Sequence, residues 1–156
     1  MRVRILLSLA VLLAVTTATV HARDFALVSN ESGGVKSVTA AELMSIAKGT
    51  LTHWPDGKPV TLVLRVPASP AMKPIVQKLY DMPTSQVNSL IFEANRARPD
   101  TPAFVLVNSD EAVVKRVEST PGAVGLVDVY SITGGIRVVR VAGKLPLQPG
   151  YLLHSD

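Results

Sequence analysis

The chain has 156 residues, no cysteine, 47% hydrophobic residues, 4% aromatic residues and a formal net charge of +4. This length suits one domain, and the lack of cysteine excludes a disulfide scaffold, a cysteine metal site and a lipid-modified cysteine. The few aromatic residues and the small charge excess argue against a nucleic-acid-binding protein, which uses both basic residues and stacking aromatics.

The first 22 residues have the pattern of a secretory signal peptide. Arg2 and Arg4 form a basic region, residues 5–15 form an apolar run, and small residues precede a cleavage point after Ala22. The apolar run is too short to cross a hydrocarbon core about 30 Å thick, so no stable membrane anchor is expected after cleavage. We expect a nearly neutral mature domain, residues 23–156, that is exported to the periplasm, with full secretion as the alternative.

The first half of the mature chain predicts a strand, a helix and a second strand. A buried strand at residues 25–29 leads into a polar turn. A capping box of Thr39 and Glu42 then opens a helix, which Gly49 ends. A Trp-Pro-Asp-Gly turn follows, and its proline and glycine suit a tight turn before the strand at residues 60–66.

Two helices follow in the middle of the chain. Ser69 is predicted to cap the first of them, with Pro70 at the first helical position. The second begins after Pro83 and ends near Arg96, and its apolar residues recur at helical spacing. A short apolar strand is expected at residues 103–107.

The last part of the chain predicts one more helix and two strands. Asn108 or Ser109 caps the helix, whose first turn carries two acidic residues where the helix dipole favours them. Apolar strands are expected at residues 123–129 and 136–142, before an irregular tail at residues 146–156.

This alternation predicts an α/β fold, in which a mostly parallel mixed sheet has helices on both faces. In such sheets ligands bind at the carboxyl ends of strands, near the loops that open helices. The loops at residues 29–34, 65–70 and 108–110 are therefore the places where a ligand is expected.

Enzyme motifs are missing from the sequence. It has no Gly-x-Ser-x-Gly elbow, phosphate loop, Gly-x-Gly-x-x-Gly or His-Glu-x-x-His. His53 and His154 have no paired metal-ligand spacing, and Asp110-Glu111 is explained by helix capping. We expect no enzymatic activity, no catalytic residue, no metal and no cofactor, with a hydrolase as the disfavoured alternative.

One loop has a physical case for binding an anion. Arg65 ends a predicted strand and offers a forked, charge-assisted contact, and Ser69 offers a hydroxyl donor four residues later. The amides of Ala71 and Met72 lie in the first turn of the predicted helix, where the dipole is positive. The alternative is that Ser69 only caps the helix and Arg65 pairs with a surface carboxylate.

Two further features are open to more than one interpretation. Ser29, Asn30 and Ser32 are expected to reach the same end of the sheet as Arg65, or else they form an ordinary polar turn. Trp54 either packs over its own turn or stacks on a ligand.

The order of these motifs resembles that of phosphate ABC-transporter substrate-binding proteins, of the periplasmic-binding-protein-like type 2 class. The resemblance spans about residues 25–141. It rests on three segments: the helix of residues 39–49, the Trp-Pro-Asp-Gly turn with the strand ending at Arg65, and the Thr-Pro-Gly-Ala-Val-Gly run of residues 120–125. Arg65 and Ser69 match the family's Arg-x-x-x-Ser-Gly-Thr anion loop, in which Pro70 and Ala71 replace the glycine and the threonine.

The resemblance implies a single lobe of a fold whose full-length members have two. It also implies that the protein holds phosphate or a similar small oxyanion, for transport or sensing, with a transporter or another envelope protein as partner. Since one lobe cannot enclose its ligand, we expect affinity no better than the micromolar to millimolar range. The alternative is an interaction module that uses the lobe as a scaffold to recruit an envelope protein.

Overall fold

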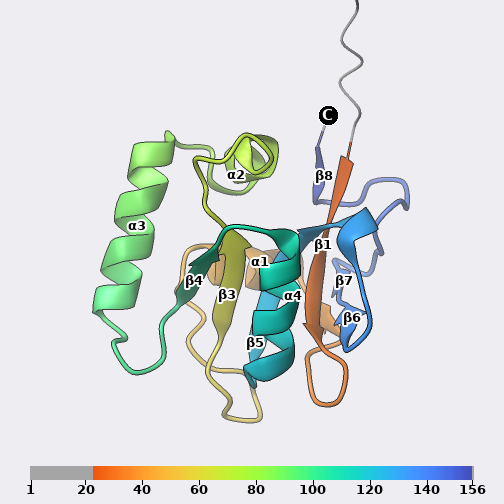
Figure 1. Cartoon of the computed structure of the whole chain (residues 1–156), viewed down its shortest axis with the longest axis horizontal. Helices are drawn as coiled ribbons and strands as arrows, with labels where there is room; N and C mark the ends of the chain where they lie inside the picture. Colours follow the sequence, from red (N-terminus) through yellow and green to blue (C-terminus); the bar gives the residue numbers. More distant parts are fainter. Residues whose placement is uncertain (1–22, 156) are drawn as a thin grey trace, which may run out of the picture.

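The computed structural model describes residues 23–155, which form a mixed sheet flanked by helices (Figure 1). The predicted leader, residues 1–22, lies outside the described residues. The helices are α1 (Ala40–Ala47), α2 (Lys73–Tyr80), α3 (Thr84–Arg96), α4 (Asp110–Ser119) and the short 3-10 helix η1 (Val129–Ser131). The strands are β1 (Arg23–Asn30), β2 (Ser37–Val38), β3 (Thr61–Arg65), β4 (Phe104–Val107), β5 (Ala123–Asp128), β6 (Ile136–Val138), β7 (Arg140–Val141) and β8 (His154–Ser155). Within residues 23–155, no helix combines the length and the apolar character that crossing a membrane requires.

The sheet has a parallel part and an antiparallel part. Its strand order is β4-β3-β5-β1-β6, and β8 also pairs with β1. β3 runs parallel to both of its neighbours, whereas β1 runs antiparallel to β5, β6 and β8. The carboxyl ends of β3, β4 and β5 therefore share one edge of the sheet with the beginning of β1, and this edge is called the carboxyl edge below.

Helices cover both faces of the sheet. Alternate residues of β3 point to opposite faces, because side chains of a strand alternate. Leu62 and Leu64 belong to the apolar core that α1, α2 and α3 cover, and Val63 packs with Val113 and Val117 of α4 on the other face. The prediction of an α/β lobe with helices on both faces is confirmed.

Local capping signals explain where two helices begin. The hydroxyl of Thr39 accepts the amide N–H of Glu42 at 3.1 Å, and the Glu42 carboxylate accepts the Thr39 N–H at 2.7 Å. The hydroxyl of Ser109 accepts the amide of Ala112 at 3.1 Å, which opens α4. Both predicted caps are confirmed, with Ser109 rather than Asn108 in the second case.

The predicted start of α2 is wrong. The helix begins at Lys73, four residues after Ser69, and no side chain caps it. Residues 67–72 form turns in which the carbonyl of Ser69, not its hydroxyl, accepts the amides of Met72 and Lys73 at 3.0 and 3.2 Å. The proline in the first turn of the helix is Pro74, so the Ser-Pro start signal belongs to a turn.

The end of the chain is more ordered than predicted. Residues 154–155 form β8, which pairs with the beginning of β1, and Tyr151 and Leu153 lie in the core. The amide of Phe25 donates to the carbonyl of Leu153 at 2.9 Å. The segment expected to be an irregular tail therefore supplies core side chains and part of the sheet.

Candidate functional site

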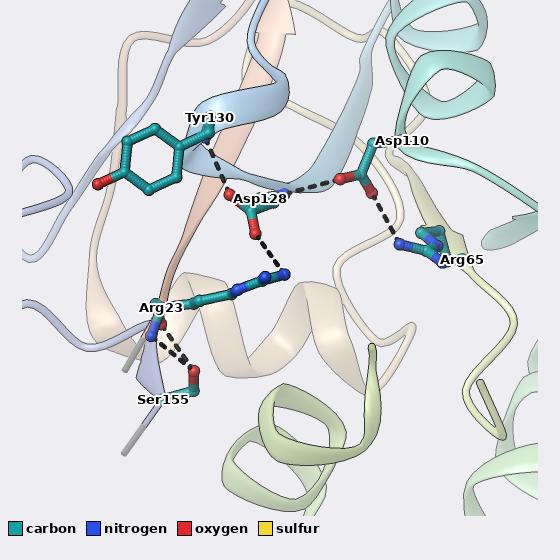
Figure 2. Close-up of polar contacts among 6 residues, drawn as sticks. All are labelled: Arg23, Arg65, Asp110, Asp128, Tyr130 and Ser155. Atoms are coloured by element: carbon teal, nitrogen blue, oxygen red, sulfur yellow. Dashed lines mark hydrogen bonds and ion pairs between the residues drawn. The ribbon is translucent and has the colours of Figure 1, made fainter. Parts of the chain in front are cut away.

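Arg65 occupies the last position of β3, at the carboxyl edge. Its guanidinium Nη1 lies 3.7 Å from Oδ1 of Asp110, the first residue of α4, and both side chains are partly buried. Figure 2 shows the two side chains facing each other, Arg65 from the end of β3 and Asp110 from the beginning of α4. Among the described residues, neither Nε of Arg65 nor Oδ1 of Asp110 has a hydrogen-bond partner, although both are buried.

Asp128 links this pair to the beginning of β1. The amide N–H of Asp128 donates to Oδ2 of Asp110 at 3.2 Å, and its carboxylate pairs with the guanidinium of Arg23 at 3.3 Å. The same carboxylate accepts the N–H of Tyr130 at 2.9 Å and so caps η1. The two arginines and two aspartates form one connected set along the carboxyl edge (Figure 2).

The Arg65–Ser69 loop contains a second buried group without a partner. The hydroxyl oxygen of Ser69 is buried, and no described residue forms a hydrogen bond with it. Ala71 is exposed, whereas Met72 is fully buried and its N–H is used within the turn by the Ser69 carbonyl. Of the four residues predicted in this loop, Arg65 and Ser69 thus each have a buried polar side-chain atom without a partner among the described residues, and the Met72 amide is already occupied.

The prediction that Ser29, Asn30 and Ser32 reach the same end of the sheet as Arg65 is wrong. Because β1 runs antiparallel to β5, Ser29 pairs with Val124, near the beginning of β5 and at the opposite edge. The Ser29 hydroxyl is buried and donates to the carbonyl of Val35 at 2.6 Å. The Asn30 side chain accepts both the amide and the hydroxyl of Ser32, so the polar-turn interpretation is correct.

Trp54 packs over its own turn at this opposite edge. Its indole N–H donates to the carbonyl of Gly122 at 2.8 Å, and its ring packs against the apolar core. Trp54 and Gly122 belong to two of the motifs that carry the family resemblance. Their contact joins the two motifs in space and gives the tryptophan a structural role.

Sequence reasoning missed several residues of the carboxyl edge. Asp128 lies next to the end of the strand predicted at residues 123–129, so the rule that ligands bind at the carboxyl ends of strands is the signal that could have found it. Arg23 begins β1, and only the antiparallel direction of β1 brings it to this edge. Across residues 23–155, no three His, Asp or Glu side chains gather closely enough to hold a metal ion.

Comparison with known proteins agrees with the fold. Residues 15–146 match the family model of the PBP superfamily domain, so the chain belongs to the PBP superfamily. The resemblance seen in the sequence motifs is confirmed at this level. No curated protein matches the sequence.

Solved structures of phosphate-transport proteins share the fold. An ABC-type phosphate transport receptor from Vibrio cholerae matches with a TM-score of 0.68 at 18% identity, over 86% of this chain and 54% of that chain. PstS from Borrelia burgdorferi matches with a TM-score of 0.63 at 16% identity, over 86% and 55%. A phosphate-binding protein from Stenotrophomonas maltophilia matches with a TM-score of 0.58 at 18% identity, over 80% and 40%. The chain therefore spans about half the length of the first two of these structures and 40% of the third.

Proposed function

We propose that this protein is an exported, non-enzymatic binding protein that holds phosphate or a related oxyanion at the loop from Arg65 to Ser69. The observation that carries the proposal is the pair of buried donors without partners, the Arg65 Nε–H and the Ser69 hydroxyl. A buried donor left unpaired costs about 1–3 kcal/mol, so such groups in a native fold call for an acceptor. An oxyanion supplies acceptors for both.

The place of the loop in the fold supports the same function. Arg65 ends a central parallel strand, which is where open α/β sheets bind ligands. The matched structures include proteins named for phosphate transport and phosphate binding. By analogy, the partner of this chain would be an ABC transporter or another protein of the cell envelope, and its place of action the periplasm.

Asp110 indicates which oxyanions the proposed site prefers. Its carboxylate lies beside the Arg65 guanidinium and has one buried oxygen without a hydrogen bond among the described residues. That oxygen repels a fully deprotonated anion but accepts a hydrogen bond from one that still carries a proton. The arrangement favours hydrogen phosphate over sulfate at neutral pH.

Calorimetric titration of the purified protein with phosphate and sulfate tests the proposal. We expect phosphate to bind in the micromolar to millimolar range and sulfate to bind more weakly. Arg65→Ala should abolish binding, and Ser69→Ala should weaken it by about tenfold, since a hydrogen bond to a charged group contributes about 1.5–3 kcal/mol. Asp110→Asn should reduce the preference for phosphate over sulfate.

Ser32→Ala is the matched control, because Ser32 lies in the polar turn at the opposite edge of the sheet and should not affect binding. No heat and no thermal shift with about 10 mM phosphate would contradict the proposal. Equal binding by the Arg65→Ala variant would also contradict it, since Arg65 would then serve only its ion pair with Asp110.

A second candidate function is an interaction module that recruits an envelope protein. It is favoured by exposed apolar side chains next to the carboxyl edge, Val66 after β3 and Leu106 in β4. Cross-linking in envelope extracts should then capture a partner with the native protein and lose it with the double variant Val66→Ser, Leu106→Ser. A phosphate affinity unchanged in that variant would separate the two functions.

A further inference from the structure

A cavity of about 510 Å³ lies beside the beginning of β1, and none of its lining residues belongs to the Arg65–Ser69 loop. Its walls come from β1, from the last turn of α2, from η1 and from residues 147–154 near the end of the chain. Figure 1 shows α2, β8 and the beginning of β1 gathered in this part of the molecule. The volume falls within the range of small-molecule sites in proteins.

Two side chains of the cavity wall, Tyr130 and Leu147, are exposed although hydrogen bonds fix their backbone N–H groups. Tyr130 is 83% exposed, and its N–H is fixed by the Asp128 carboxylate at 2.9 Å. Figure 2 shows its ring projecting away from the Arg65–Asp110 pair. An exposed aromatic ring on a fixed backbone is a ready stacking surface for a planar group.

Leu147 forms another wall of the cavity. Its side chain is 67% exposed and its φ is +69°, a left-handed conformation that disfavours a branched side chain. The N–H of Leu147 donates to the carboxylate of Asp24, which is 4% exposed. The fold thus holds Leu147 in a strained conformation that exposes its apolar side chain, a combination that occurs at ligand sites.

The polar side chains of the cavity wall include one carboxylate, that of Asp24, and one ammonium, that of Lys78. One oxygen of Asp24 accepts the Leu147 N–H, and the other contacts Nδ1 of His154. The ammonium of Lys78 donates to the carbonyl of His154 and, among residues 23–155, forms no ion pair with a carboxylate. An ammonium has three N–H donors, so Lys78 retains donors for an anion.

From these observations we infer that the cavity binds a small organic anion with a planar apolar body. Its carboxylate or phosphate group contacts the Lys78 ammonium, and its body lies between Tyr130 and Leu147. This site goes beyond the proposed oxyanion function, because it uses none of the residues of the Arg65–Ser69 loop and selects for an organic group that inorganic phosphate lacks.

Titration of the purified protein with phenyl phosphate and with benzoate, followed by amide NMR shifts, tests this site. We expect saturable shifts at residues 128–131 and 147–154 with at least one of the probes, and the probe that binds identifies the acid group. Tyr130→Ala and Lys78→Gln should each weaken binding by about tenfold, whereas Tyr130→Phe should retain it. Tyr130→Ala is the safer variant for folding, because this side chain is largely exposed.

Inorganic phosphate separates this site from the proposed function. Phosphate at about 10 mM should not displace the bound probe, whether or not phosphate binds at Arg65. The inference is overturned if neither probe shifts these residues or if Tyr130→Ala and Lys78→Gln bind as well as the native protein. It is also overturned if all shifts disappear in Arg65→Ala, because the probe then occupies the oxyanion loop.

Discussion

Position 122 requires glycine for two reasons, the backbone conformation and the lack of room for a side chain. Its φ is +83°, in the left-handed region, and a Cβ there would lie 2.2 Å from the carbonyl oxygen of Pro59. The Trp54 indole reaches the same residue with its hydrogen bond to the Gly122 carbonyl. The Trp-Pro-Asp-Gly turn and the Pro-Gly motif therefore pack so closely that only glycine fits between them.

Gly122→Ala should destabilise the fold by about 2 kcal/mol more than Gly57→Ala. Gly57 has a similar φ of +87°, but no heavy atom lies within 4 Å of the position its Cβ would take. In both variants alanine must adopt the left-handed conformation, which costs about 1–2 kcal/mol of stability. Only Gly122→Ala adds a clash with the backbone. Urea unfolding of the two variants measures the difference, and equal losses would show that the close approach does not matter.

Burial raises the pKa of the Tyr80 hydroxyl, because a phenolate is poorly solvated inside the protein. The pKa in the folded protein lies above the ordinary value of about 10. The neutral hydroxyl's contribution to the free energy of unfolding is therefore fully present below about pH 10 and is lost as the pH rises above it. Among the described residues, the buried hydroxyl has no hydrogen-bond partner. Tyr80 is thus held neutral by desolvation alone.

Tyr80→Phe should therefore leave stability at pH 8 unchanged or slightly higher and reduce its loss between pH 8 and pH 11. Urea unfolding at the two pH values gives the comparison. Tyr130→Phe is the control, because it removes a hydroxyl from an exposed side chain and should leave the loss of stability at high pH as in the native protein. An alkaline loss as large in Tyr80→Phe as in the native protein would refute the role of this side chain.

At the scale of elements, helix starts depend on whether a hydroxyl meets a free amide. Thr39 and Ser109 accept amides of the first turns of α1 and α4, and both were predictable from local sequence. Ser69 also carries a hydroxyl and precedes a proline, yet the chain continues through turns and α2 begins only at Lys73. The local signal was present in all three cases, and the path of the chain leaving β3 decided the third.

Substitution of the three hydroxyl residues should separate caps from the proposed ligand group. Thr39→Ala and Ser109→Ala should each cost about 1 kcal/mol of stability, because each leaves an amide of a helix start unpaired. Ser69→Ala should cause no loss of stability in the phosphate-free protein, because no described residue bonds its hydroxyl and the removal of an unpaired buried donor is neutral or stabilising. Chemical denaturation checks all three, and a loss at Ser69 equal to that at Thr39 would make it a structural residue.

At the scale of the whole molecule, the direction of β1 decides which loops meet. Had β1 run parallel to β5, the turn after Ser29 would lie at the carboxyl edge, two strands away from Arg65. Its antiparallel pairing with β5 places that turn at the opposite edge and brings Arg23 to the carboxyl edge instead. The end of the chain returns to the same strand, where β8 pairs with β1.

Leu153→Ala should cost about 3 kcal/mol, whereas Leu152→Ala should cost less than about 1 kcal/mol. The neighbouring leucines differ in environment: Leu153 is 0% exposed within the core and Leu152 is 39% exposed. Thermal or urea unfolding of the two variants tests whether the end of the chain is integral to the fold. Equal small effects would mean that this segment packs only loosely.

Features whose physics is local could be predicted from the amino-acid sequence. Apolar runs predicted the central strands, capping residues predicted α1 and α4, and the Arg65–Ser69 spacing predicted the candidate anion loop. Features that depend on residues far apart in the chain became visible in the three-dimensional fold. Strand direction separated Ser29 from Arg65, and pairing of the last residues with β1 formed part of the wall of the cavity beside the beginning of β1. Hydrophobic periodicity records which face of an element is buried but not which way a strand runs in the sheet, so no local pattern could have revealed either.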